Sequence, residues 1–216
     1  LNLRIDFQIR KNLTPEENVY YGKLYFIGKE VPYDINKAIY FFTLAANQND
    51  TYAQWILGSI YYEGKHVPQN IDKAIIYYSL AKNHPQAQYY LGWIYLSKLN
   101  NKFDINKALH CFSISAGLNF SEAQFVLGQI YFDGEYVSQD ISKAILFFKL
   151  AANQNHLDAQ INLGKIFYFN LYCPKNINKA IQYLTLAANQ NDQFSQNLLA
   201  QIYLLDKEVK QDIEKV

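Results

Sequence analysis

Histidine and cysteine side chains are the groups in this sequence best suited to bind a metal or attack a substrate. They are His66, His84, His110, His156, Cys111 and Cys173. No two of them stand at the close spacing that zinc ligands need, so we expect no metal site. Cys111 falls in a position that is aromatic elsewhere in the chain, which predicts a buried residue rather than a nucleophile. Two cysteines are too few for a disulfide framework, which favours a reducing compartment such as the cytoplasm over the periplasm or a host cell.

One short motif has the look of a catalytic site. The segment SLAK, which starts at Ser79, has the serine–lysine spacing of penicillin-recognising enzymes. The Lys-Thr-Gly and Ser-Asp-Asn motifs of those enzymes are absent from the chain, and so are glycine-rich phosphate loops. We therefore predict no catalytic residue and no small-molecule cofactor. A hydrolase or β-lactam-binding enzyme is the alternative that this segment leaves open.

An internal sequence repeat predicts the helices that would position any functional site. One motif recurs as AQWILGSIYYEG from Ala53, AQYYLGWIYLSK from Ala87, AQFVLGQIYFDG from Ala123 and AQINLGKIFYFN from Ala159. A second motif, such as DINKAIYFFTLAAN from Asp34, follows each copy. The glycines of the first motif, Gly22, Gly58, Gly92, Gly128 and Gly164, are separated by 36, 34, 36 and 36 residues. This period predicts five full helical repeats and a truncated sixth over residues 14–216, after an extended or flexible lead-in at residues 1–13.

Each repeat is expected to contain two antiparallel helices. In the first helix, Ala53, Leu57 and Ile60 recur at helical spacing. Gly58 lies inside that pattern at a cost of about 1 kcal/mol relative to alanine, so we expect another helix backbone to pass close by. Each second helix follows an Asp or Asn that can cap it, at Asp34, Asn70, Asp104, Asp140, Asn176 and Asp212. Asparagines that tolerate left-handed backbone follow the second helices, at Asn49, Asn119, Asn155 and Asn191.

The combined pattern of both motifs resembles the Sel1-like repeat, a relative of the tetratricopeptide repeat with a longer unit. The resemblance covers roughly residues 17 to 216. It implies an all-α solenoid, a right-handed superhelix of antiparallel helix pairs, with the first helices lining a concave face. Family members typically act as adaptors, scaffolds and host-interaction or immunity proteins, so the resemblance implies a non-catalytic protein that binds other proteins.

Positions that vary between the repeats indicate where a partner could bind. One stripe on the first helices varies in this way, and in the expected superhelix it faces the concave groove. Its candidate binding residues are Lys23, Trp55, Ser59, Tyr89, Trp93, Phe125, Gln129, Ile161 and Lys165. Both tryptophans of the chain lie on the stripe, and tryptophan and tyrosine are enriched at binding hot spots. A third column of the stripe, Phe26, Tyr62, Phe132 and Tyr168, is expected to pack in the core instead.

Composition narrows the class of partner. The net charge is +1 and no run of Lys and Arg occurs, so we expect no nucleic-acid binding. No stretch of 18 apolar residues occurs, so we expect no membrane insertion. The expected partner is another protein, held as an extended peptide or an amphipathic helix in the concave groove. The alternative is a structural spacer within a longer protein, because the chain lacks methionine and ends inside a repeat.

Overall fold

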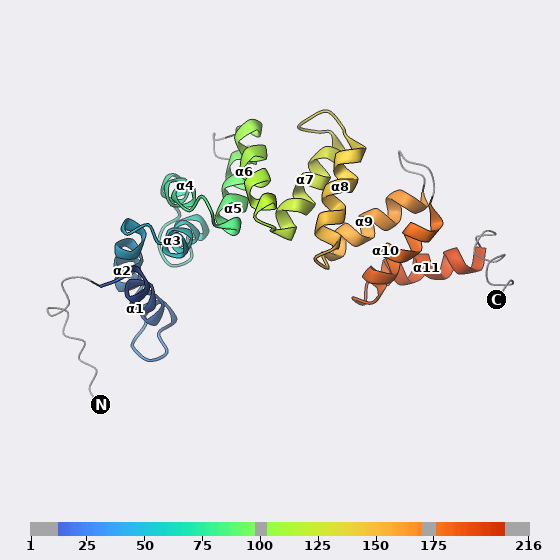
Figure 1. The fold of residues 1–216 in the computed structure, drawn as a ribbon. Coiled ribbons are helices and arrows are strands. Elements are labelled where there is room, and N and C mark those ends of the chain that lie inside the picture. The colour runs from blue at the N-terminus through green and yellow to red at the C-terminus, as the bar shows by residue number, and fades with distance from the viewer. Residues whose placement is uncertain (1–12, 98–102, 170–175, 206–216) are drawn as a thin grey trace. The chain divides into compact units, whose positions relative to one another are not determined.

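The computed structural model describes residues 13–97, 103–169 and 176–205, and every element in these ranges is an α-helix (Figure 1). The lead-in predicted for residues 1–13, the cap at Asp212 and Cys173 therefore lie almost entirely outside the described residues. The helices are α1 (Pro15–Ile27), α2 (Ile35–Asn47), α3 (Thr51–Glu63), α4 (Ile71–Leu80), α5 (Pro85–Leu96), α6 (Ile105–Gly117), α7 (Ser121–Asp133), α8 (Ile141–Ala152), α9 (Leu157–Tyr168), α10 (Ile177–Ala188) and α11 (Gln193–Leu205). The prediction of an all-α repeat fold is confirmed.

The chain divides into two compact units, Leu1–Ile114 and Ser115–Val216, with the boundary inside α6. In the first unit α1 packs on α2, α2 on α3, α3 on α4 and α4 on α5. In the second unit α7 packs on α8, and the same order of contacts continues to α11. Odd-numbered helices are the first helices of the repeats and even-numbered helices are the second ones, as Figure 1 shows for each unit. Stability of such an array comes from contacts within and between neighbouring repeats.

The predicted caps begin and end the helices. Asp34 accepts a hydrogen bond from the backbone N–H of Lys37 at 3.0 Å, and the equivalent bond recurs at the start of α4, α6, α8 and α10. Thr14 and Glu17 form the capping box of α1. Left-handed backbone occurs at Asn49, Asn119, Asn155 and Asn191, and at Gly28, Gly64 and Gly134 after first helices. These residues tolerate that conformation at least steric cost, which explains why they recur.

The mid-helix glycine has a different cause from the one expected. A Cβ added at Gly58 would lie 2.5 Å from the Tyr78 ring, so a side chain of the second helix, not a helix backbone, occupies the space. The prediction of a close backbone was therefore wrong. The same position in the other repeats faces Phe42, Phe112, Phe148 or Leu184. These side chains are fully buried, so in each of these five repeats the first helix packs around a large residue from its own second helix.

A buried glutamine joins neighbouring repeats. Gln54 on α3 donates its side-chain amide to the Ala46 carbonyl at the end of α2, at 3.2 Å. Glutamines at the same position of α5, α7, α9 and α11 make the equivalent bond to the preceding second helix. In the second unit Gln190 donates in turn to Oε1 of Gln160 at 2.8 Å. These backbone carbonyls lie at the ends of the second helices, where they also accept backbone N–H groups from the turn that follows. The glutamines, which are buried except for the exposed Gln196, thus add a second donor that ties each first helix to the preceding repeat.

Candidate functional site

Trp93 is the most exposed of the four aromatic residues predicted to bind a partner. Its side chain on α5 is 37% exposed, whereas Tyr89, one turn earlier, is half-buried. The two rings meet edge to face at 84°, with centroids 6.2 Å apart. Both rings also touch Phe112 of α6, at 6.0 and 5.6 Å. The core below therefore holds the two rings in place, and the outer part of the Trp93 indole remains open to solvent.

Trp55 is less available than the sequence suggested. Its indole is half-buried and stacks on the His84 ring, with centroids 4.6 Å apart and an angle of 14°. Tyr52 covers its edge at 5.4 Å. The indole Nε1 is buried and has no hydrogen-bond partner among the described residues, so it cannot reach an acceptor on a partner protein. Much of this ring therefore serves the junction between the second and third repeats.

The stripe residues of the second unit have a similar division of roles. Phe125 on α7 is half-buried, stacks on His156 at 4.5 Å and lies 5.7 Å from Phe148. Gln129 is exposed, and Ile161 on α9 is half-buried. The third column of the stripe, Phe26, Tyr62, Phe132 and Tyr168, packs against the hydrophobic clusters, as predicted.

The two stripe lysines each contact an aromatic ring of the next repeat. The Lys23 ammonium lies 4.1 Å from the Tyr52 ring centroid, and that of Lys165 lies 4.4 Å from the Phe194 centroid. A cation over a ring face is attracted by about 0.5–1 kcal/mol at an exposed site. These lysines thus join adjacent first helices in addition to any role in binding an acidic group.

Ser59 has a structural partner. It accepts a hydrogen bond from the hydroxyl of Tyr78 at 3.2 Å. Burial raises the pKa of the Tyr78 hydroxyl above its ordinary value, because the charged form loses hydration. Tyr78 therefore stays protonated and able to donate, and Ser59 is committed to the core of its repeat.

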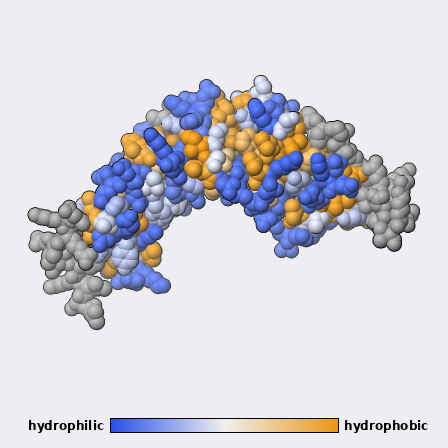
Figure 2. Space-filling view, viewed as in Figure 1, coloured by the Kyte–Doolittle hydropathy of each residue, from blue (hydrophilic) through white to orange (hydrophobic). Residues whose placement is uncertain are grey.

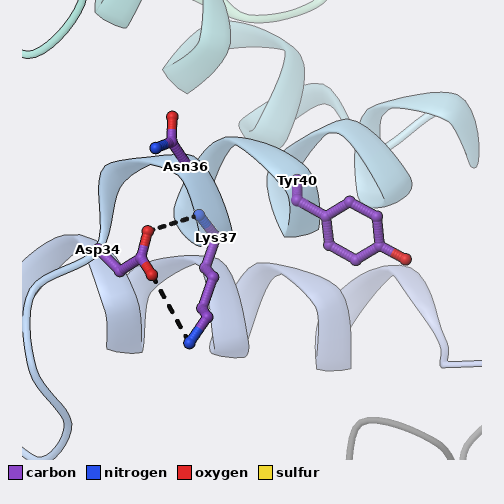
Figure 3. A pocket seen from close by; sticks show the side chains of 4 residues that line it. All are labelled: Asp34, Asn36, Lys37 and Tyr40. Carbon is purple, nitrogen blue, oxygen red and sulfur yellow. Dashed lines mark hydrogen bonds and ion pairs between the residues drawn. The ribbon is translucent and has the colours of Figure 1, made fainter.

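The lysine of the second motif also has a structural role, which sequence reasoning missed. Lys37 forms an ion pair with Asp34 at 3.6 Å and lies 5.0 Å from the Tyr25 ring centroid on α1. Figure 3 shows the ion pair of Asp34 and Lys37 beside Asn36 and Tyr40, which line the same shallow depression at the start of α2. Equivalent lysines lie over the first helix in every described repeat that contains both helices. The regular recurrence of an aromatic residue and a lysine at fixed offsets was the available signal.

A second apolar surface was not predicted. Several large apolar side chains on the second helices point to solvent, namely Tyr40, Ile76 and Leu80 in the first unit and Leu146, Leu150 and Leu186 in the second. Figure 2 shows orange, apolar residues among polar ones over α4 and over α8. Their exposed fractions, from 38% to 57%, equal or exceed that of Trp93. In the sequence, this surface could have been recognised from the apolar residues that lie beside, rather than on, the buried stripe of each second helix.

The chemical candidates are placed in unreactive surroundings. Cys111 is buried, and burial raises the pKa of its thiol to about 11. A thiol in this state is a poor nucleophile, because the thiolate is the reactive form. His66 bonds through Nδ1 to the hydroxyl of Tyr33 at 2.8 Å. In the part of the chain that the structure describes, no three His, Cys, Asp or Glu side chains group as a metal site would require.

Comparison with known proteins places these features in a family. The model of the Sel1 repeat matches six times, at residues 18–50, 51–84, 85–120, 121–156, 157–192 and 193–215. Sel1 repeats generally mediate protein–protein interaction and are generally non-catalytic scaffolds. Among the described helices, none is long and apolar enough to cross a membrane. A search of curated proteins gave no match to this sequence.

Solved structures show the same fold. The chain is similar to c5321, a protective antigen of uropathogenic Escherichia coli with an SLR fold, at 30% identity and a TM-score of 0.81. That match covers 88% of this chain but only 41% of the antigen, so this chain spans less than half the length of that relative. A Sel1 repeat protein from Oxalobacter formigenes matches at 25% identity and a TM-score of 0.74, over 92% of this chain and 84% of its own.

Proposed function

Because this chain belongs to the Sel1 repeat family, we propose that it is a non-catalytic adaptor whose first-helix stripe binds a segment of another protein. The observation that carries the proposal is the exposed Trp93 indole, held by Tyr89 on an uncharged part of the stripe. A large ring fixed by its neighbours loses little conformational freedom on binding, which is why such residues dominate binding energies.

The chemistry of the stripe favours an apolar anchor on the partner. Trp93 and Tyr89 offer ring faces and polar ring atoms but no charge. Lys23 already contacts Tyr52 of the next repeat at 4.1 Å, so it adds a positive edge rather than the main contact. A peptide or an amphipathic helix with one apolar side chain over the Trp93 indole fits this arrangement. The groove expected along the first helices would then hold the flanking residues of the partner.

Affinity capture from the native host tests this proposal. Wild type, Trp93→Gln and a control, Ile76→Gln, would be used as bait, because both residues are exposed but lie on first and second helices respectively. We expect a partner that wild type and Ile76→Gln retain and that folded Trp93→Gln loses. Circular dichroism would establish that each variant is folded.

The apolar surface of the second helices supports a second candidate site. If Ile76→Gln loses the partner and Trp93→Gln retains it, the binding surface lies on the second helices, and the first-helix proposal is wrong. If wild type and both variants capture no specific protein, a structural spacer function is favoured instead.

A further inference from the structure

Two histidines occupy the same place in the repeat, one in each unit. His84 is the N-cap of α5 and His156 is the N-cap of α9. Each ring stacks on an aromatic side chain from the preceding first helix, His84 on Trp55 at 4.6 Å and His156 on Phe125 at 4.5 Å. The interplanar angles are 14° and 23°. An imidazole ring is therefore part of two repeat junctions, and each ring contacts one residue of the first-helix stripe.

The surroundings of His84 disfavour a proton. Its Nδ1 is buried and has no hydrogen-bond partner among the described residues. The ring lies at the N-terminus of α5, where the helix dipole repels a cation, and the first turn of α5 contains no acidic residue. The charged groups on the adjoining elements are Asp50 and Glu63 at the two ends of α3, Asp72 and Lys73 in the first turn of α4, and the exposed Lys82 on the connection after α4. None of them contributes to the shift of the His84 pKa, which burial alone lowers.

His156 makes a hydrogen bond that His84 lacks. Its Nδ1 accepts from the backbone N–H of Ala159 at 3.4 Å, so this ring caps α9. His156 is therefore a matched stacked ring whose Nδ1 already has a partner.

We propose that the stacked His84 makes the junction between the second and third repeats sensitive to mild acid: protonation separates its imidazole from the Trp55 indole and loosens the packing at the start of α5. One interaction opposes this change, because an aromatic face attracts a cation. Burial of the unpartnered Nδ1 and the helix N-terminus act in the other direction, and burial lowers the pKa of His84. The folded state therefore prefers neutral His84, and the stabilisation is lost as the pH falls through the ordinary histidine value of about 6.5.

The tryptophan fluorescence of this chain can report on His84 directly. The chain has two tryptophans, so Trp93→Phe leaves Trp55, the residue stacked on His84, as the sole indole. Its emission would be recorded from pH 8 to pH 5, with and without His84→Asn, since asparagine is a good N-cap that does not titrate in this range. We expect a change in emission with a midpoint below pH 6.5 that disappears in His84→Asn.

Hydrogen exchange tests the consequence for the fold. The first amides of α5 should lose protection between pH 7.5 and pH 5, relative to those of α3, and His84→Asn should abolish that loss. An NMR titration of the His84 ring in the unmodified chain gives a measurement that needs no variant. A midpoint above 6.5 would overturn the proposal, and so would an equal pH response in wild type and His84→Asn.

Discussion

Replacing Gly58 by alanine should destabilise the first unit, although alanine is the better helix former. The Cβ of the variant would lie 2.5, 2.6 and 3.0 Å from three carbons of the Tyr78 ring. Carbon atoms in favourable contact are about 3.5–4.0 Å apart, so the ring must move by roughly 1 Å. Tyr78 is fully buried, and its hydroxyl bonds to Ser59 at 3.2 Å, so little free space is available for that movement.

The expected magnitude follows from three effects. Adding a methyl group to a well-packed core typically costs about 1–3 kcal/mol. Loss of the Tyr78–Ser59 hydrogen bond adds about 1 kcal/mol. Removal of a mid-helix glycine returns about 1 kcal/mol. We therefore expect the free energy of unfolding of the first unit to fall by roughly 1–3 kcal/mol in Gly58→Ala.

The chain offers two matched controls. At Gly117, in the last turn of α6, an added Cβ meets nothing within 4 Å, so Gly117→Ala should be neutral or stabilising by up to about 1 kcal/mol. At Gly164 the obstacle is the end of the Leu184 side chain, at 2.6 Å, which can rotate more easily than a ring. Gly164→Ala should therefore cost less than Gly58→Ala. The sixth repeat has Ala200 at this position, and that residue is exposed.

Urea unfolding followed by circular dichroism provides the measurement for all three variants, because Gly117 and Gly164 lie in the second unit. The fluorescence of Trp55 and Trp93 follows the first unit separately. Unfolding midpoints should be compared within one probe, since repeat arrays can depart from two-state behaviour. Equal stability of Gly58→Ala and wild type would refute the argument that the Tyr78 ring requires the glycine. Equal loss of stability in Gly117→Ala would show that the effect has nothing to do with packing.

Three further predictions concern the junctions, the caps and the thiol. Gln160→Ala should lower the free energy of unfolding of the second unit by about 1 kcal/mol, because the Ala152 carbonyl keeps the backbone N–H of Asn155 but loses the Gln160 donor, whereas truncation of the exposed Gln190 should cost less. Urea unfolding followed by circular dichroism measures both effects. The backbone N–H of Lys143 holds the pKa of Asp140 below its usual value, so this cap stabilises the fold above about pH 4 and its contribution is lost as the pH falls further. Acid unfolding should accordingly be less pH-dependent in Asp140→Asn. With Cys173 replaced by serine, Cys111 should react with a thiol reagent at pH 8 only when urea opens the fold, since a thiol with a pKa of about 11 is ionised in about one molecule in a thousand.

The sequence was sufficient for the fold because the repeat presents the same signals several times. The caps at Asp34 and its equivalents depend only on a short side chain next to a free backbone N–H, and such local chemistry can be read from residue type. The left-handed positions at Asn49 and Asn119 are local in the same way. A chance pattern would not recur in register at so many positions, so the helix pairs and their order followed directly.

The candidate site could be predicted only in part, because exposure depends on neighbours that are distant in sequence. Periodicity placed Trp55 and Trp93 on one stripe of the first helices. It could not show that His84, from the following junction, covers Trp55, or that Trp93 stays 37% exposed. The interval of 34 rather than 36 residues between Gly58 and Gly92 reflects a turn before Pro85 that is two residues shorter than its equivalents, and this turn lies beside the junction.

The amino-acid sequence by itself determined the repeat, its helices, their caps and the small residue inside each first helix. The tertiary structure decided what that small residue faces, which is a buried side chain such as Tyr78 rather than a backbone. It also decided that Gln54 and its equivalents join neighbouring repeats, and that the recurring lysines lie over aromatic rings. The physical reason is that helix formation and capping depend on groups a few residues apart, whereas burial and ring contacts depend on how whole helices pack.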